Sequence, residues 1–233
     1  MDNYIIFNGV DSRTINGIII SELPPIIKPA KRCSLEEIDG RDGDNITVQG
    51  YKAFDISIEI GLTKNYDIDM IIDWLNSSGK LVLSTDPGKY YNATVLEQID
   101  FKKLLRFRTA TIKFHVQPFK YYLDEKKDVL EISSETSLTV YSKGNYKSNP
   151  IISLEGSGVV EVAIDGITAF KYTFPANETE VVIDGEQQDA YLNEIYKNRN
   201  MIGKFPILTP GKHVISWSGS LTKITVNPCS RWI

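Results

Sequence analysis

Cysteine and histidine are scarce in this chain of 233 residues, which has two of each. Cys33 and Cys229 lie far apart, so their spacing does not establish a disulfide, and the sequence favours two buried or half-buried free thiols. No cluster of cysteine and histidine has the spacing of a metal site. We therefore expect neither a bound metal nor a cofactor.

Long hydrophobic runs and basic patches are also missing. No segment approaches the roughly 18 uninterrupted apolar residues that a membrane-spanning helix needs. The N-terminal sequence MDNYIIFNGVDS lacks the basic and apolar regions of a secretion signal. The net charge is −4, without the basic excess that marks nucleic-acid-binding proteins. We therefore expect no membrane span, no targeting segment and no nucleic-acid binding.

Motifs that carry chemistry are absent too. His115 and His213 each lie in a strand-like pattern, where a lone histidine is more often packed or solvent-facing than a general base. Residues 40–43, Gly-Arg-Asp-Gly, lack both the spacing and the following helix of a phosphate-binding loop. These patterns predict no catalytic residue.

Acidic residues gather before and after this glycine-containing turn. They are Glu36, Glu37, Asp39, Asp42 and Asp44. A glycosidase needs two carboxyls at a set separation on rigid walls, which a glycine-containing loop does not provide. The sequence after Asp44 and Asn45 also does not continue the ligand pattern of a calcium-binding EF-hand loop. We interpret the segment as a solvated hairpin or an interface loop, and we predict that the chain is not an enzyme.

The most informative segment spans residues 34–55, SLEEIDGRDGDNITVQGYKAFD. Gly40 and Gly43 bracket two charged residues. Because glycine tolerates a positive φ, the pair predicts a tight turn at the tip of a hairpin. Arg41 and Asp42 are then expected to point outward from that tip.

The rest of the first half reads as strands with one helix. Apolar runs at residues 4–7 and 18–20 predict a hairpin with a longer loop. Other strand-like segments are residues 46–62, 80–84, 90–99 and 106–118. A helix is predicted at residues 67–76, beginning near Asp67, because apolar residues recur there at helical spacing. The face expected to pack inward consists of Ile68, Ile71, Ile72 and Leu75.

The sequence pattern changes near residues 118–128, where a run of charged residues follows the last strong strand pattern. Beyond it the periodicity is almost purely β, with turns at the spacing of an antiparallel sandwich. Candidate strands are residues 137–141, 151–155, 159–164, 169–174, 179–183, 212–217 and 221–226. Two domains are therefore predicted, residues 1–128 and residues 129–233.

The order of these features resembles the distal tail proteins of long-tailed bacteriophages, the siphoviruses. The early Gly-Arg-Asp-Gly turn, the short helix, the Asn-Pro-Ile-Ile of residues 149–152 and the late run PGKHVISWSG of residues 210–219 follow one another as in that family. The resemblance covers essentially the whole chain. It implies a mainly β fold with one short helix: an N-terminal tail-tube-like β domain and a C-terminal galectin-like antiparallel β-sandwich.

The same resemblance implies a structural component of the virion tail tip, made in the bacterial host cytoplasm. Distal tail proteins form a hexameric ring that joins the tail tube to the baseplate and the host-adsorption hub. The implied partners are other copies of the chain, the tail tube protein and the tail-associated hub or tail fibre protein, with receptor-binding proteins at the periphery. A head-to-tail ring needs two different complementary patches. Arg41 and Asp42 are the candidate interface residues.

The alternative interpretation is a carbohydrate-binding module of a phage host-recognition apparatus. His213 and Trp217 have the same parity in one predicted strand, but the other polar residues of a galectin-type sugar site do not surround them. A core or interface tryptophan is favoured instead, because a fold does not by itself supply an activity. A wall-degrading enzyme is the third class considered.

Overall fold

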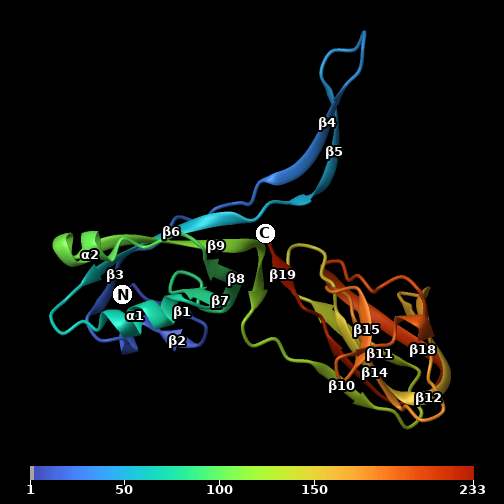
Figure 1. Cartoon of the computed structure of the whole chain (residues 1–233). Helices are drawn as coiled ribbons and strands as arrows, with labels where there is room; N and C mark the ends of the chain where they lie inside the picture. The colour runs from blue at the N-terminus through green and yellow to red at the C-terminus, as the bar shows by residue number, and fades with distance from the viewer. Residues whose placement is uncertain (1–2) are drawn as a thin grey trace. The chain divides into compact units, whose positions relative to one another are not determined.

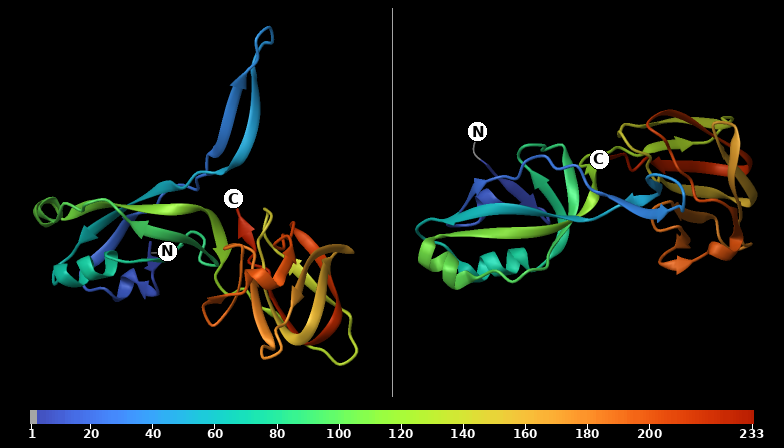
Figure 2. Two further views of the ribbon diagram at one scale, coloured as in Figure 1. Left: turned by 45° about the vertical axis from the view of Figure 1, so that its right-hand side comes forward. Right: turned by 90° about the horizontal axis from the view of Figure 1, so that it is seen from above.

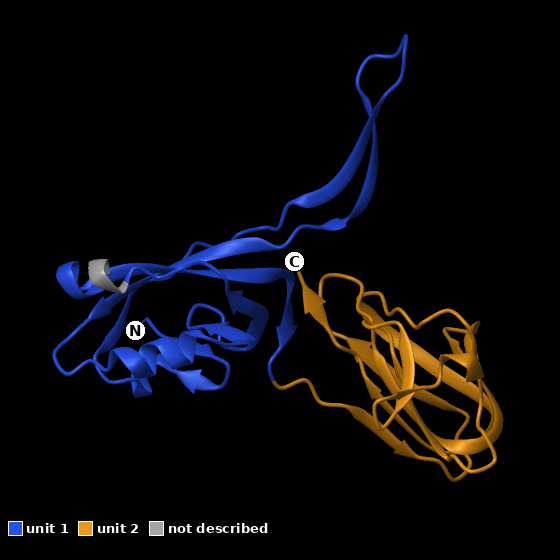
Figure 3. Cartoon of the chain, in the orientation of Figure 1, with its two compact units in different colours: residues 1–123, 233 blue, residues 124–232 orange. Residues whose placement is uncertain are grey.

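The computed structural model describes residues 3–233, except the side chains of residues 101–103. The chain divides into two compact units, residues 1–123 with residue 233, and residues 124–232 (Figures 1 and 3). Both units consist mainly of antiparallel strands, so the predicted mainly β fold is confirmed. The expectation of a single helix is wrong, because the described residues contain two α-helices. The domain boundary after residue 128 stays a prediction.

The first unit is built on one antiparallel sheet with the strand order β2-β1-β7-β8-β9-β6-β3. The strands are β1 (Ile5–Phe7), β2 (Val10–Asp11), β3 (Ile18–Glu22), β6 (Phe54–Leu62), β7 (Ser78–Leu83), β8 (Lys89–Val95) and β9 (Thr109–Tyr122). A 3-10 turn, η1 (Ser12–Thr14), precedes β3. Alternate side chains of β6 and β9 enter the core, among them Ile58 and Phe114, which are completely buried. The strand-like segments predicted at residues 46–62 and 106–118 thus contain two strands of the sheet, β6 and β9.

The predicted hairpin between residues 4–7 and 18–20 is wrong. β1 pairs with β2 and with β7, whereas β3 pairs with β6. Asn8 and Gly9 both have a positive φ and form a two-residue turn. An Asn-Gly pair favours such a turn, which joins β1 to the strand that immediately follows it, β2. The Ser12 hydroxyl then accepts a hydrogen bond from the Ile5 amide at 3.1 Å, which folds the chain back before β3 begins.

Helix α1 (Ile68–Leu75) begins as predicted, because the Asp67 carboxylate accepts a hydrogen bond from the Met70 amide at 3.1 Å. The predicted inward face is only partly correct. Ile71 is fully buried and Leu75 is buried, but Ile72 is 40% exposed. The reason is Trp74, whose indole Nε1 donates to the carbonyl of Phe7 on β1 at 3.2 Å. Seating the indole there turns Ile72 toward solvent.

Helix α2 (Phe101–Phe107) was not predicted and occupies the start of the expected strand 106–118. Among the described side chains of this helix, that of Leu104 is completely buried. The helix ends at Phe107, and the next residue, Arg108, has a positive φ and a carbonyl that accepts a hydrogen bond from the Leu62 amide at 2.8 Å. β9 then runs past Pro118, which lies where the register between β8 and β9 shifts, so its missing N–H is tolerated.

The second unit contains β10 (Asp128–Glu131), β11 (Ser137–Ser142), β12 (Ile151–Ile164), β13 (Ile167–Thr173), β14 (Glu180–Asp184), β15 (Asp189–Leu192), β16 (Ile195–Tyr196), β17 (Met201–Gly203), β18 (Gly211–Asn227) and β19 (Arg231–Trp232), with a 3-10 turn η2 (Asn198–Asn200). The main strand order is β10-β18-β12-β14-β15-β16. β11 also pairs with β18, and β13 pairs with β12 and β17. The galectin-like assignment stays a prediction.

Two pairs of predicted strands in this unit are in fact two long strands, β12 and β18. They pair with each other along most of their lengths, with register shifts on either side of Ser157 (Figure 2). Glycines allow the close approach at these irregularities. A Cβ on Gly156 would lie 2.3 Å from the Ser220 carbonyl oxygen, and one on Gly219 would lie 2.2 Å from that of Val159. The strands therefore bend around their core where the sequence pattern suggested separate strands.

Candidate subunit interface

A two-stranded ribbon extends away from the sheet of the first unit (Figures 1 and 2). It is formed by β4 (Lys31–Glu37) and β5 (Asp44–Tyr51), which are antiparallel and, among the described strands, pair only with each other. At its base, a backbone hydrogen bond joins the two legs of the ribbon and an aromatic contact fixes the ribbon to the sheet. The Lys52 amide donates to the Ala30 carbonyl at 2.8 Å, and the Tyr51 ring packs edge-to-face on Phe119 of β9, with ring centroids 5.6 Å apart. We call residues 31–51 the hairpin.

The tip of the hairpin has the predicted conformation. Gly40 and Gly43 have φ of 78° and 82°, and the Arg41 amide donates to the Ile38 carbonyl at 3.1 Å. Arg41 and Asp42 are both exposed. Across the described part of the chain, neither residue forms an ion pair. Both charges are therefore available to a partner, although their role at a subunit interface stays a prediction.

One face of the hairpin is apolar. Leu35 lies directly opposite Ile46, and Cys33 lies opposite Val48, so all four side chains are on the same side of the ribbon. Leu35, Ile46 and Val48 are 62%, 61% and 51% exposed, and Cys33 is half-buried. We call these four residues the apolar face.

The opposite face of the hairpin is polar. Ser34 lies across from Thr47, and Glu36 across from Asn45. An isolated two-stranded hairpin is at best marginally stable in water, and exposed apolar patches commonly mark interaction sites. The two-faced ribbon thus has the construction expected of a surface that another chain covers.

Sequence reasoning identified the charged tip but not the apolar face. The sequence does contain a pattern that indicates an apolar face, because apolar and polar residues alternate in CSLEE (33–37) and in NITVQ (45–49). That alternation also fits a strand packed on a core, and residues 46–62 read as one continuous strand. The structure separates this segment into β5 in the hairpin and β6 in the sheet.

The hairpin becomes acidic toward its tip. Glu37 lies directly opposite Asp44, on the side of the ribbon that also carries Leu35 and Ile46. Like charges in opposite positions are destabilising in a free ribbon. No group of three or more metal-ligating side chains that could hold an ion was found in the described region. A cationic surface on a partner would relieve this repulsion.

The two histidines have different surroundings, neither of which activates a nucleophile. His115 Nδ1 lies 2.8 Å from the Asp55 carboxylate on the exposed side of the sheet. His213 is buried, with Nδ1 2.6 Å from Asp165 and Nε2 2.7 Å from the carbonyl oxygen of Thr209. That carbonyl accepts the Nε2 hydrogen bond, so the Thr209 hydroxyl, 3.4 Å away, is not positioned as a nucleophile for this ring.

Asp165 instead serves to join two parts of the second unit. Its carboxylate accepts the Val214 amide at 2.8 Å, and this bond, together with the contact to His213, lowers the pKa of Asp165 despite partial burial. The bonds tie the turn between β12 and β13 to the start of β18. Trp217 follows on β18 and is buried in the core cluster, as the sequence favoured. His213 and Trp217 are thus both buried.

Cys33 and Cys229 are both free thiols of intermediate burial. Burial, followed by the nearby Glu125 carboxylate, raises the pKa of Cys229 to about 12, so its thiol is un-ionised at neutral pH. In the region that the structure describes, no helix is long and apolar enough to cross a membrane.

Comparison with known proteins places this geometry in context. Residues 12–116 match the family of the phage tail protein RIFT-related domain. The crystal structure of the Dit protein of phage SPP1, described as a paradigm of the hub adsorption apparatus in phages that infect Gram-positive bacteria, is similar over 100% of both chains, with 15% identity and a TM-score of 0.72. A chain of the phage p2 baseplate in its activated conformation is 9% identical, with a TM-score of 0.52 over 96% of this chain and 97% of that one.

No curated protein sequence matches the chain significantly. The family match covers most of the first unit, and the similarity to SPP1 Dit extends through the second. Residues 12–116 thus match the family of the phage tail protein RIFT-related domain, and the chain has, over its whole length, the fold of SPP1 Dit, in agreement with the resemblance found in the sequence.

Proposed function

We propose that this chain is a distal tail protein that assembles into a hexameric ring at the virion tail tip, where it joins the tail tube to the baseplate and the host-adsorption hub. The observation that carries the proposal is the hairpin, which presents an uncovered apolar face on a distal tail protein fold. Its partners would be five further copies of the chain, the tail tube protein, and the hub or tail fibre protein.

Burying the apolar face against another chain would contribute several kcal/mol to the free energy of association. Burying a Leu, Ile or Val side chain completely contributes about 1.5–3 kcal/mol. Leu35, Ile46 and Val48 retain half or more of their exposure in the single chain, so most of that gain is still available to an interface. Part of it offsets the entropy of association. In a closed ring every chain uses the hairpin and its receiving surface once, so no interface is left unsatisfied.

The direct test is the mass of the purified protein in solution at several concentrations, with negative-stain images of the same samples. The proposal predicts a mass that rises from 26.3 kDa for one chain toward that of six chains, with ring-shaped particles. Because the tail tube or hub protein can be needed to complete assembly, the measurement is repeated with each of them present. A monomer under all of these conditions would contradict the proposal.

Arg41→Ala is expected to weaken ring formation while leaving the monomer's thermal unfolding nearly unchanged. Arg41 is exposed in the single chain, where surface substitutions usually change stability by about 0.5 kcal/mol or less. At an interface that desolvates its charge, removing one partner of a charge pair costs about 2–5 kcal/mol. Light scattering at matched concentrations measures assembly, and Lys64→Ala, at another exposed position of the first unit, is the control. Equal assembly of Arg41→Ala and wild type would show that the tip is only a solvated turn.

A further inference from the structure

We propose that the hairpin tip of one copy docks on helix α2 of the next copy. This inference rests on the proposed ring function and names the receiving surface that the ring requires. It is carried by three observations: opposite charge, matching apolar exposure, and placement at opposite ends of one strand.

Apart from Arg41, whose partner would be an acidic residue outside α2, the charges of the two surfaces are complementary. Residues 36–44 contain five carboxylates and one arginine, and the opposed Glu37 and Asp44 concentrate negative charge beside the apolar face. Residues 101–108, FKKLLRFR, contain two lysines, two arginines and no acid. Arg106 and Arg108 are exposed, and neither forms an ion pair with any other described residue. Complementary charge of this kind sets the register and specificity of an interface.

Helix α2 and its surroundings also expose apolar side chains, as the hairpin does. Phe107 is 61% exposed, with the guanidinium of Arg106 5.4 Å from its ring centroid, and Leu105 is exposed as well. Beside the helix, the exposed Leu96 lines a groove together with Ile72 and Ile99. Among its described lining residues, the groove itself carries Glu97 and no basic residue. It is Leu105 and Phe107, beside the exposed Arg106, that match the apolar side chains next to the acidic pair of the hairpin.

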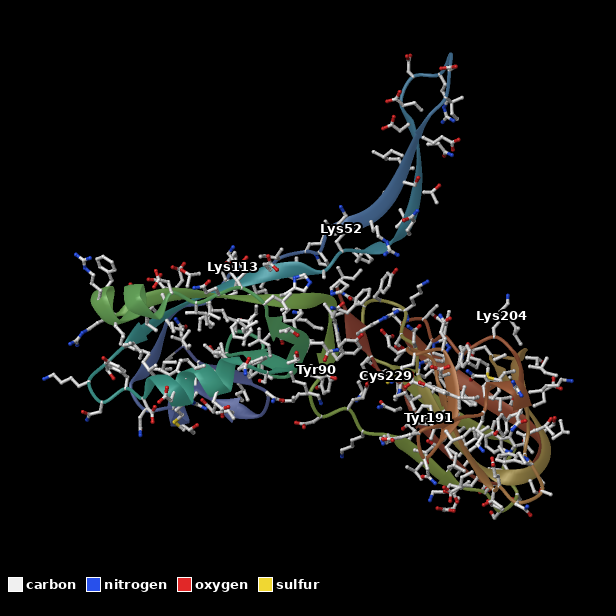
Figure 4. The ribbon with its side chains drawn as sticks, in the orientation of Figure 1. Lys52, Tyr90, Lys113, Tyr191, Lys204 and Cys229 are labelled. Atoms are coloured by element: carbon white, nitrogen blue, oxygen red, sulfur yellow. The ribbon has the colours of Figure 1, made fainter. Side chains whose placement is uncertain are left out.

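The hairpin and α2 lie at opposite ends of β6. The hairpin ends at Tyr51, just before β6 begins at Phe54, and the last residue of β6, Leu62, bonds to the carbonyl of the residue that follows α2. Nine strand residues span about 30 Å at roughly 3.3 Å each. In Figure 4, Lys52 marks the hairpin base, and Lys113 lies along β9 on the way to α2. Two complementary surfaces at opposite ends of a subunit are what a head-to-tail ring needs.

Charge reversal tests the contact in the full-length protein. The first variant is Arg106→Glu with Arg108→Glu, the second is Asp39→Lys with Asp42→Lys, and the third combines all four changes. A control, Lys204→Glu with Lys212→Glu, makes the same change of charge as the first variant at exposed positions of the second unit. Assembly is followed as the protein concentration at which half of the chains are in rings. Thermal unfolding of each variant confirms that it is folded.

Each reversal alone is expected to raise the half-assembly concentration by at least about tenfold, because like charges then face each other across the interface. The combined variant should return most of the way to wild type, and the control should behave as wild type. If Arg106→Glu/Arg108→Glu lowers the unfolding temperature, Arg106→Gln/Arg108→Gln replaces it, with a smaller increase expected.

Two results would overturn the contact. One is wild-type assembly by a folded Arg106→Glu/Arg108→Glu variant, and the other is a combined variant no better than its two parents. If rings form in the wild type and are lost when the apolar face is changed, but not when α2 is changed, the ring function stands and docking on α2 is wrong. If the wild type forms no ring under any condition, including with its tail partners, the proposed function is wrong, and the docking inference with it.

Discussion

Replacing Leu35 and Ile46 together with serine is expected to abolish ring assembly at concentrations where the wild type is fully assembled. The two side chains lie opposite each other at the centre of the apolar face. Losing the burial that an interface adds to both side chains removes about 2–4 kcal/mol from each interface, which is a factor of at least about 30 in affinity. The monomer should unfold at an unchanged temperature, since both side chains are more than 60% exposed in the single chain.

A matched control lies on the other side of the same ribbon. Ser34 and Thr47 are also directly opposite each other, one position further along, and face away from Leu35 and Ile46. The variant Ser34→Ala with Thr47→Ser should assemble close to wild type. Mass by light scattering and negative-stain images measure both variants. Rings from the Leu35→Ser/Ile46→Ser variant at wild-type concentrations would show that the apolar face is not the contact.

Ile71→Ala is expected to destabilise the first unit by about 2–5 kcal/mol, whereas Ile72→Ala should cost less than about 1 kcal/mol. The two residues are identical, adjacent and in the same helix, so helix propensity cancels in the comparison. Ile71 is fully buried against the sheet, and truncating it leaves a cavity, while Ile72 is 40% exposed. Denaturant unfolding of the monomer gives both free energies. Similar losses for both variants would mean that α1 is rotated relative to the orientation described above.

Features that depend on neighbouring residues could be predicted from the sequence. The positive φ at Gly40 and Gly43 follows from glycine itself, and the start of α1 follows from the capping carboxylate of Asp67. The sequence patterns of residues 54–62 and 109–118 likewise predicted the extended structure of β6 and β9. These features held because the local chemistry and the tertiary structure favour the same conformation.

Features that depend on residues far away in the sequence could not be predicted from it. The two-residue turn at Asn8 and Gly9 was readable, but nothing local showed that β7 would occupy the other edge of β1. The rotation of α1 depends on a hydrogen bond from Trp74 to Phe7, 67 positions away. Strand pairing and helix rotation of this kind are decided by tertiary contacts, which override local preference.

Helix α2 and the apolar face were missed for related reasons. The sequence RFRTATIKFHV, residues 106–116, alternates like a strand, and α2 is anchored by Leu104, a contact made only in the folded unit. Conversely, Leu35, Ile46 and Val48 follow a genuine strand pattern, but a sequence does not show whether a strand's apolar side meets its own core or another chain. The tip residues Arg41 and Asp42 were found because turn chemistry is local.

Hydrogen–deuterium exchange of the hairpin amides, residues 31–51, tests most directly the claim that this ribbon is the contact between copies. It is measured on samples below and above the assembly concentration, with the buried strands β6 and β9 as internal reference. Exposed segments with few packing contacts open readily and exchange their amide hydrogens fast, whereas segments covered by a partner are protected from exchange. We predict fast exchange of the hairpin in the monomer and exchange at least about tenfold slower in the ring, with β6 and β9 unchanged. Equal hairpin exchange in the monomer and in rings verified by mass would contradict the claim.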